Sequence, residues 1–273
     1  MTDRYAVIGN PISHSKSPQI HKMFAEQTGQ DISYEAILAP LDGFAAKIEE
    51  LRKAGYKGCN VTVPFKFEAF QLATNRSKRA EAAKAVNTLQ FDGSRIFGDN
   101  TDGVGLVRDI QVNLEFPLKN RRVLLMGAGG AAYGVALPLF DIVGSDLTVV
   151  NRTIEKANEM IQAFEIRGTL VSLYRYDDGA FRVRDFQVVI NATSTGLSDE
   201  MPPLPDTIFA RGALAYEMMY GRETPFMKFA REHGARAVDG LGMLVEQAAE
   251  SFFIWRGIRP ETAPVISALR KQR

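Results

Sequence analysis

The sequence predicts an α/β protein with two domains, and three observations support this fold class. The chain has 273 residues, which is enough for two domains that each bury a hydrophobic core. Short apolar runs alternate with amphipathic helical segments, a pattern typical of largely parallel sheets. Near the middle of the chain, residues 121–132 (RRVLLMGAGGAA) lead an apolar run directly into a cluster of glycines, as in a strand followed by a tight turn and a helix.

The composition narrows the class of protein. Apolar residues make up 45% and charged residues 24% of the chain, which are ordinary values for a globular protein. The net charge of +1 shows no electrostatic signature of a nucleic-acid or membrane partner. The single cysteine, Cys59, excludes an internal disulfide framework and is predicted to be a core residue. Because the sequence also lacks a long apolar run and a signal-peptide pattern, we expect a cytoplasmic protein that binds small molecules.

The N-terminal part is expected to contain strands at residues 5–8, 34–38 and 58–63 and helices at residues 17–24 and 44–54. Ser17 precedes Pro18, so the local sequence favours Ser17 as a helix N-cap with proline in the first helical position. Ser15 has no comparable structural role.

In the third of these strands the side chains alternate, so Val61 and Val63 should share one face and Asn60 and Thr62 the other. The two polar residues are thus expected at the carboxyl end of a strand, where open α/β sheets bind ligands. Lys66 follows at the same rim, at the start of a helix. Taken by itself, Lys66 is best interpreted as a solvated lysine, because lysine is almost never fully buried without a partner.

A helix at residues 77–84 and strands at residues 87–91 and 95–97 are expected next, followed by the acidic segment GDNTDG at residues 98–103. The spacing of acidic residues in this segment does not match a calcium-binding EF-hand loop, so no metal is expected. Thr101 or Asp102 is favoured as a helix cap, with Asp102 also a candidate functional carboxylate. A connecting helix is expected at residues 104–114.

Gly127, Gly129 and Ala132 fit the G-x-G-x-x-A form of the dinucleotide-binding fingerprint. Such glycines allow a tight turn and let backbone N–H groups approach a pyrophosphate at a helix N-terminus. The next strand, at residues 147–150, ends at the segment NRT, residues 151–153, where the fingerprint places the ribose contact. This segment contains an arginine and no acid, which favours NADP over NAD. An ordinary strand-to-helix turn is the alternative.

The β/α alternation continues with a helix at residues 154–164 and strands at residues 169–173, 187–191 and 214–218. The loop at residues 192–196 is predicted to form a rim of the cofactor site. A long apolar helix begins after residue 239, and its mixed apolar faces predict a buried helix between the domains.

Eight segments together resemble the shikimate dehydrogenase family over nearly the whole chain. They are residues 9–18 (GNPISHSKSP), 60–66 (NVTVPFK), 85–88 (AVNT), 98–103 (GDNTDG), 127–131 (GAGGA), 151–153 (NRT), 191–193 (NAT) and 239–244 (DGLGML). The resemblance implies a Rossmann-type NADP domain at residues 104–239 and a discontinuous α/β substrate domain at residues 1–103 and 240–273. It also implies reversible, NADPH-dependent reduction of 3-dehydroshikimate to shikimate in aromatic amino-acid biosynthesis. For the oligomeric state, both a monomer and a homodimer are left open.

Carried over residue by residue, the resemblance makes Lys66 and Asp102 the catalytic pair, with Lys66 as acid/base and Asp102 orienting the lysine and the substrate hydroxyl. The implied substrate ligands are Ser15, Ser17, Thr62, Lys66, Asn87, Asp102, Tyr220 and Gln247. The implied cofactor ligands are Gly127, Ala128, Gly129, Gly130, Ala131, Asn151, Arg152, Thr153, Lys156, Met218 and Gly240.

Three residues depart from the family pattern. Lys78 stands where relatives often carry an acidic residue, Tyr133 where a basic residue is common, and Glu217 where aspartate is common. Because of Lys78, the resemblance does not establish one of the family's contacts near the nicotinamide end of the cofactor. Two alternative functions stand beside this one: a quinate/shikimate dehydrogenase that uses NAD, and a dinucleotide-binding regulator without catalysis. The regulator would have no use for Lys66 together with Asp102.

Overall fold

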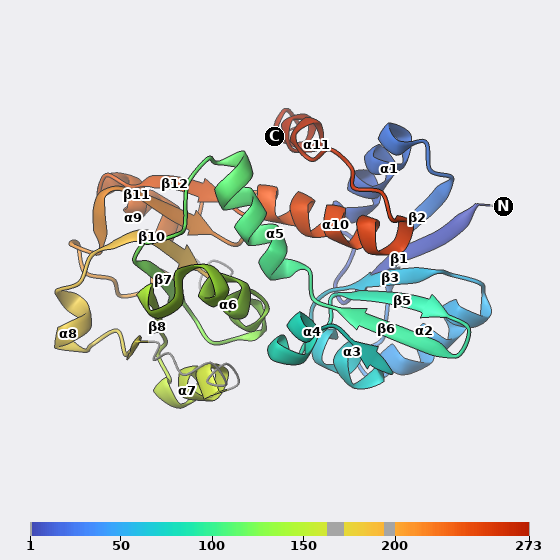
Figure 1. Ribbon diagram of the computed structural model, residues 1–273, viewed down its shortest axis with the longest axis horizontal. Helices are drawn as coiled ribbons and strands as arrows, with labels where there is room; N and C mark the ends of the chain where they lie inside the picture. Colours follow the sequence, from blue (N-terminus) through green and yellow to red (C-terminus); the bar gives the residue numbers. More distant parts are fainter. Residues whose placement is uncertain (1, 163–171, 194–199, 273) are drawn as a thin grey trace. The chain divides into compact units, whose positions relative to one another are not determined.

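The computed structural model describes residues 2–162, 172–193 and 200–272 (Figure 1). The chain forms two compact units, one of Met1–Gly105 with Leu244–Arg273 and one of Leu106–Met243. We call them unit 1 and unit 2. The assignment of substrate binding to the first and NADP binding to the second stays a prediction.

Unit 1 is built on a six-stranded sheet in the order β2-β1-β3-β5-β6-β4. Its strands are β1 (Asp3–Gly9), β2 (Ile32–Leu38), β3 (Gly58–Val61), β4 (Asn75–Arg76), β5 (Thr88–Asp92) and β6 (Arg95–Asp99). Strand β1 pairs in parallel with β2 and β3, whereas β5 runs antiparallel to β3 and β6. The sheet is therefore mixed: it is parallel over β1, β2 and β3, and the hairpin of β5 and β6 then reverses the strand direction.

The helices that lie wholly in unit 1 are α1 (Ser17–Thr28), α2 (Phe44–Lys53), α3 (Lys66–Leu72), α4 (Lys78–Ala83) and α11 (Ala263–Arg270). Helix α4 begins at Lys78, one residue after the expected start, because Ser77 is its N-cap: the Ser77 hydroxyl accepts a hydrogen bond from the backbone N–H of Ala80 at 3.1 Å. The core of the unit lies between the sheet and the helices and includes the buried rings of Phe44 and Phe65, stacked with centroids 5.0 Å apart. Cys59 is a fully buried core residue, as predicted.

In its described residues, unit 2 contains a six-stranded parallel sheet in the order β12-β11-β10-β7-β8-β9. The strands are β7 (Val123–Met126), β8 (Leu147–Val150), β9 (Ser172–Tyr174), β10 (Phe186–Asn191), β11 (Phe209–Glu217) and β12 (Arg236–Asp239). The helices are α6 (Gly130–Val143), α7 (Ile154–Gln162), α8 (Gly179–Arg182) and α9 (Pro225–Glu232), with a 3-10 turn at Gly144–Asp146. Every residue of β7 and β8 is buried, which explains their uninterrupted apolar sequences.

The chain passes between the units within α5 (Asp102–Arg108) and α10 (Leu241–Arg256). The predicted connecting helix at residues 104–114 is divided into α5 and a π-helical turn at Asp109–Asn113. The predicted burial of α10 is confirmed, since Leu241, Val245 and Phe252 are each 0% exposed. Its location between domains stays a prediction. None of the helices in the described ranges is long and apolar enough to cross a membrane.

Candidate active site

Lys66 and Asp102 form an ion pair in unit 1, although 36 residues separate them in the sequence. The Lys66 Nζ lies 2.6 Å from the Asp102 Oδ2, and the two side chains are 23% and 9% exposed. Lys66 is the first residue of α3, and Asp102 is the first residue of α5. The interpretation of Lys66 as a solvated lysine is therefore wrong, because its ammonium group is held by a buried carboxylate.

Asn87 holds the other oxygen of the same carboxylate. Its Nδ2 donates to the Asp102 Oδ1 at 2.8 Å, so both carboxylate oxygens contact side chains. The interpretation of Asp102 as a helix cap is thus wrong: it lies at the first helical position, and its oxygens face Lys66 and Asn87. Thr101 directly precedes the helix, and its hydroxyl accepts a hydrogen bond from the Asn87 Nδ2 at 2.9 Å, so its role as a cap stays a prediction.

Gln247, on α10, lies beside Asn87. Its Oε1 is 3.3 Å from the Asn87 Nδ2, while its own Nε2 donates to the carbonyl of Leu244 at 2.8 Å. The Nδ2 of Asn87 has two protons but faces three acceptors, on Thr101, Asp102 and Gln247. The contact with Gln247 is the longest of the three, and the Gln247 Oε1 also lies 3.5 Å from the Thr101 hydroxyl. The structure thus brings four of the predicted residues, Lys66, Asn87, Asp102 and Gln247, into one cluster.

Ser15 and Ser17 lie in the segment before α1 and at its first residue. The hydroxyl of Ser15 accepts a hydrogen bond from the backbone N–H of Ser17 at 3.3 Å, so Ser15 does have a local structural role. The predicted N-cap at Ser17 is wrong, because Lys16 occupies the cap position and Ser17 begins the helix. Ser17 is buried and Ser15 half-buried. Their predicted contact with the substrate carboxylate stays a prediction.

Thr62 lies just beyond the end of β3, where its backbone N–H donates to the carbonyl of Ile8 at 2.9 Å. A Cβ on Gly9 would lie 2.4 Å from the Thr62 Cγ2, so glycine at position 9 allows this close approach. Within the described ranges the half-buried Thr62 hydroxyl has no hydrogen-bond partner. Val63 is 66% exposed, which contradicts its expected place beside the buried Val61, because the strand ends at residue 61.

Asn60 serves the structure of unit 1 and does not offer its amide to a ligand. Its Oδ1 accepts from the Tyr34 hydroxyl at 2.7 Å, and its Nδ2 lies 2.9 Å from the Ser251 Oγ and 3.1 Å from the Asn87 carbonyl. The expectation that Asn60 faces the ligand is therefore wrong. This buried network was not anticipated. It includes the neutral His21, stacked on Tyr34 with centroids 4.1 Å apart, whose pKa burial lowers to about 3.

The glycine-rich turn of unit 2 connects β7 to α6. Gly127 has a φ of +107°, and a Cβ there would lie 3.1 Å from the carbonyl oxygen of Ala192, so the position favours glycine. A Cβ on Gly129 would meet no atom within 4 Å, and Gly129 and Ala131 are exposed at the N-terminus of the 14-residue helix α6. This open helix N-terminus fits the pyrophosphate of a dinucleotide. Ala128 is buried, and Gly130 begins the helix.

The segment after β8 carries the predicted ribose contacts. The Asn151 side chain donates to the carbonyl of Thr153 at 2.7 Å, which shapes the turn before α7. Arg152, Thr153 and Lys156 are exposed, and within the described ranges neither basic residue has an acidic partner. Two cations without an acidic partner in the described part of the chain thus follow the second strand of the fingerprint, and such cations suit the chemistry of a 2′-phosphate.

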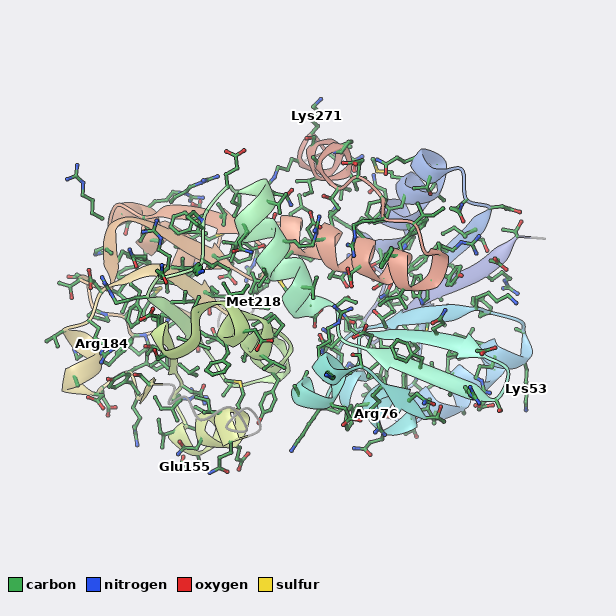
Figure 2. All side chains as sticks on the ribbon, in the orientation of Figure 1. Lys53, Arg76, Glu155, Arg184, Met218 and Lys271 are labelled. Atoms are coloured by element: carbon green, nitrogen blue, oxygen red, sulfur yellow. The ribbon has the colours of Figure 1, made fainter. Side chains whose placement is uncertain are left out.

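The ends of β11 and β12 carry the remaining predicted contacts of unit 2. Met218, labelled in Figure 2, follows β11, and Gly240 follows β12. A Cβ on Gly240 would lie 2.3 Å from the carbonyl oxygen of Met218, so only glycine allows these segments to meet. Tyr220 is half-buried in unit 2, and burial raises the pKa of its phenol. Residues 194–196 of the predicted loop at 192–196 lie outside the described residues.

Comparisons with known proteins find similar families and structures along most of the chain. Residues 7–89 match the family described as shikimate dehydrogenase substrate binding domain, residues 110–198 match shikimate / quinate 5-dehydrogenase, and residues 240–270 match the shikimate 5'-dehydrogenase C-terminal domain. Among solved structures, an Ael1 enzyme from Pseudomonas putida is 49% identical, with a TM-score of 0.93 and 98% of each chain covered. Shikimate 5-dehydrogenase from Thermus thermophilus, in complex with NADP(H) and shikimate, is 32% identical, with a TM-score of 0.87 and 99% of each chain covered.

A curated sequence relative shows a higher identity than these solved structures. The shikimate dehydrogenase (NADP(+)) of Methylobacillus flagellatus is 60% identical over 269 residues, which cover 98% of this chain and 99% of that protein. This identity over nearly the full length of both chains, together with the matching family models, shows that this chain belongs to the shikimate dehydrogenase family.

Proposed function

We propose that this protein is a cytoplasmic NADP-dependent shikimate dehydrogenase, which reversibly reduces 3-dehydroshikimate to shikimate in aromatic amino-acid biosynthesis. The relatives named above support the activity, and the Methylobacillus protein supports the cofactor. The single observation that carries the proposal is the ion pair of Lys66 and Asp102, with Asn87 on the second carboxylate oxygen.

In this mechanism Lys66 moves the proton of the reacting hydroxyl. When bound, NADP accepts a hydride at its nicotinamide ring in the oxidative direction and supplies one in the reductive direction. During oxidation Lys66 takes the hydroxyl proton, and during reduction it returns a proton to the developing alkoxide. Asp102 orients the lysine and accepts a hydrogen bond from the same hydroxyl. Because Asn87 and Lys66 hold its two oxygens, the carboxylate needs little rearrangement when the substrate binds.

The remaining substrate contacts are proposed from the resemblance to the family, and their polar groups suit the chemistry of shikimate. Its carboxylate needs hydrogen-bond donors, and Ser15, Ser17 and Tyr220 supply hydroxyl groups for it. Thr62, Asn87 and Gln247 supply polar groups for the ring hydroxyls. On the cofactor side, residues 127–131 would hold the pyrophosphate, while Met218 and Gly240 would lie against the nicotinamide half.

A steady-state assay that crosses two substrates with two cofactors tests the proposed function. We expect turnover with shikimate and NADP⁺, with much weaker activity when quinate replaces shikimate or NAD⁺ replaces NADP⁺. Equal activity with quinate and NAD⁺ would favour a quinate/shikimate dehydrogenase. Binding of NADP⁺ without turnover of either substrate would contradict an enzymatic function.

Replacing Arg152 with alanine should weaken the preference for NADP⁺. Arg152 follows β8 and has no acidic partner within the described ranges, so its guanidinium can make a bidentate contact with the 2′-phosphate. Loss of such a charge-assisted contact costs about 1.5 to 3 kcal/mol, so kcat/KM for NADP⁺ should fall about 10- to 100-fold. The value for NAD⁺, which lacks the phosphate, should change little. If both values fall by the same factor, Arg152 does not bind the phosphate.

A further inference from the structure

Glu217 is a buried carboxylate at the end of β11, and within the described ranges no cation pairs with it. The residue is 0% exposed. Its Oε2 accepts hydrogen bonds from the Asn191 Nδ2 and the Thr224 Oγ1, each at 2.9 Å, and its Oε1 accepts from the Met219 backbone N–H at 3.1 Å. Burial of a carboxylate is costly unless hydrogen bonds compensate for the lost water. The three hydrogen-bond donors that contact the two oxygens therefore compensate for the burial of the Glu217 carboxylate.

Other hydrogen bonds orient the side chains of Asn191 and Thr224 so that they act as donors to Glu217. The backbone N–H of Thr193 donates to the Asn191 Oδ1 at 3.1 Å, which turns the Asn191 Nδ2 toward Glu217. The Thr224 hydroxyl accepts from the Met227 N–H at 3.3 Å, so its own proton is free for Glu217. Burial raises the pKa of Glu217, while these hydrogen bonds oppose that rise. A protonated Glu217 would point its O–H at donors, so the contacts favour the ionised form.

Through these bonds one carboxylate connects the ends of several neighbouring strands. It holds the backbone of Met219, whose carbonyl accepts from the Gly240 N–H at 2.9 Å, after β12. It also holds Asn191, and thereby Thr193, after β10. The Glu217 side chain thus adds a hydrogen-bonded link between the backbones that follow β10, β11 and β12, beside the backbone bonds that already join them.

The sheet order identifies which half of a dinucleotide this rim would meet. All strands of this sheet are parallel, but their sequential order changes between β10 and β7: β7, β8 and β9 follow one another toward one edge, and β10, β11 and β12 toward the other. In folds of this type a dinucleotide lies across such a switch point. The ribose segment at residues 151–153 follows β8, on one side of the glycine-rich turn. The adenosine half therefore belongs on the β8 side. The nicotinamide half belongs on the side of β10, β11 and β12.

We propose that Glu217 is a positioning residue that acts through the backbone of residues 218–219 and through Asn191 to hold the rim for the nicotinamide half of the cofactor. This role rests on the proposed NADP-dependent function. Glu217 itself is buried and does not touch the cofactor. Its effect should therefore be confined to one half of the dinucleotide, which a purely structural role would not produce.

The test compares the binding of two ligands to Glu217→Gln by isothermal titration calorimetry. NADP⁺ contains both halves, whereas adenosine 2′,5′-bisphosphate contains only the adenosine half. Glutamine keeps the shape but directs an NH₂ group toward donors. The dissociation constant of NADP⁺ should rise about tenfold, which corresponds to one lost hydrogen bond to a charged group. That of the bisphosphate should change by less than about twofold.

A milder variant and a control complete the experiment. Thr224→Val removes one donor from Glu217 and should raise the dissociation constant of NADP⁺ by about threefold, again without changing that of the bisphosphate. This variant decides the question if Glu217→Gln does not fold. Glu223→Gln removes an exposed carboxylate, paired with Arg231, from the same segment of unit 2. It should leave both affinities unchanged.

Equal weakening of both ligands in Glu217→Gln and Thr224→Val would assign Glu217 a general structural role and overturn the proposal. Unchanged affinity for both ligands would overturn it as well. The wild-type protein separates this inference from the proposed function. If it binds neither ligand, both fail, whereas if it binds both and oxidises shikimate, a negative result in the variants refutes only the role of Glu217.

Discussion

Lys66→Ala is expected to lower the turnover of shikimate by about 100- to 10,000-fold, the usual contribution of a general acid–base group. The Lys66 Nζ lies 2.6 Å from the Asp102 Oδ2, and the Lys66 side chain is 23% exposed, so the residue is not sealed off from a ligand. Steady-state kinetics with shikimate and NADP⁺ measure the loss. The dissociation constant of NADP⁺ should stay within about twofold of the wild-type value, since residue 66 lies outside the glycine-rich turn and the ribose segment.

A matched control is available in the same unit. Lys53 is an exposed lysine in the last turn of α2, labelled in Figure 2, and Lys53→Ala should retain full turnover. Turnover of Lys66→Ala within about tenfold of the wild-type rate would contradict a role of Lys66 in proton transfer. An equal loss in both lysine variants would point to an effect of net charge rather than of a specific contact.

Asp102→Asn is expected to lower turnover by about 10- to 100-fold, because it removes the charge from a hydrogen-bonded ion pair. The substitution preserves the shape of the side chain and should leave α5 folded, which circular dichroism and thermal unfolding can verify. The uncharged amide no longer holds the ammonium of Lys66, and its NH₂ group would face the Nδ2 of Asn87 or Lys66 itself. Steady-state kinetics with shikimate measure the loss.

The double variant of Lys66→Ala and Asp102→Asn tests whether the two residues act together. Since both are proposed to contact the same hydroxyl, the loss in the double variant should be well below the product of the two single losses. A fully multiplicative loss would show that they act independently. A fully active Asp102→Asn enzyme would remove Asp102 from the mechanism.

The glycine-rich turn illustrates what could be predicted from neighbouring residues alone. Residues 123–132 contain both the buried strand and the turn, and Gly127 indeed adopts a φ of +107°. A turn of this kind depends on the conformations open to a few successive residues, so its glycines identify it in the sequence. The positions of most strands follow from apolar runs for the same reason. The strands expected at residues 87–91 and 95–97 form the antiparallel hairpin of β5 and β6, because the few residues between them are too short a connection for parallel strands.

The partners of the polar residues required the folded chain. Local sequence indicated a solvated Lys66, a capping Asp102 and a capping Ser17, and all three interpretations were wrong. Asn60 was placed at the correct end of its strand, but its hydrogen bonds to Tyr34 and Ser251 make it a structural residue. The motifs of the family anticipated the grouping of Lys66 with Asp102, yet they gave no reason for it.

The sequence by itself determined the alternation of strands and helices, the dinucleotide turn and, through its motifs, the family. These depend on backbone propensity, on side-chain periodicity and on residues close together in the chain. Only the tertiary structure decided which polar groups are paired. Asn60 and Ser251, or Asn191 and Glu217, become neighbours because strands and helices from distant parts of the chain pack together. Each such group depends on its partner once it is buried, because a buried polar group without a hydrogen bond lowers the free energy of unfolding.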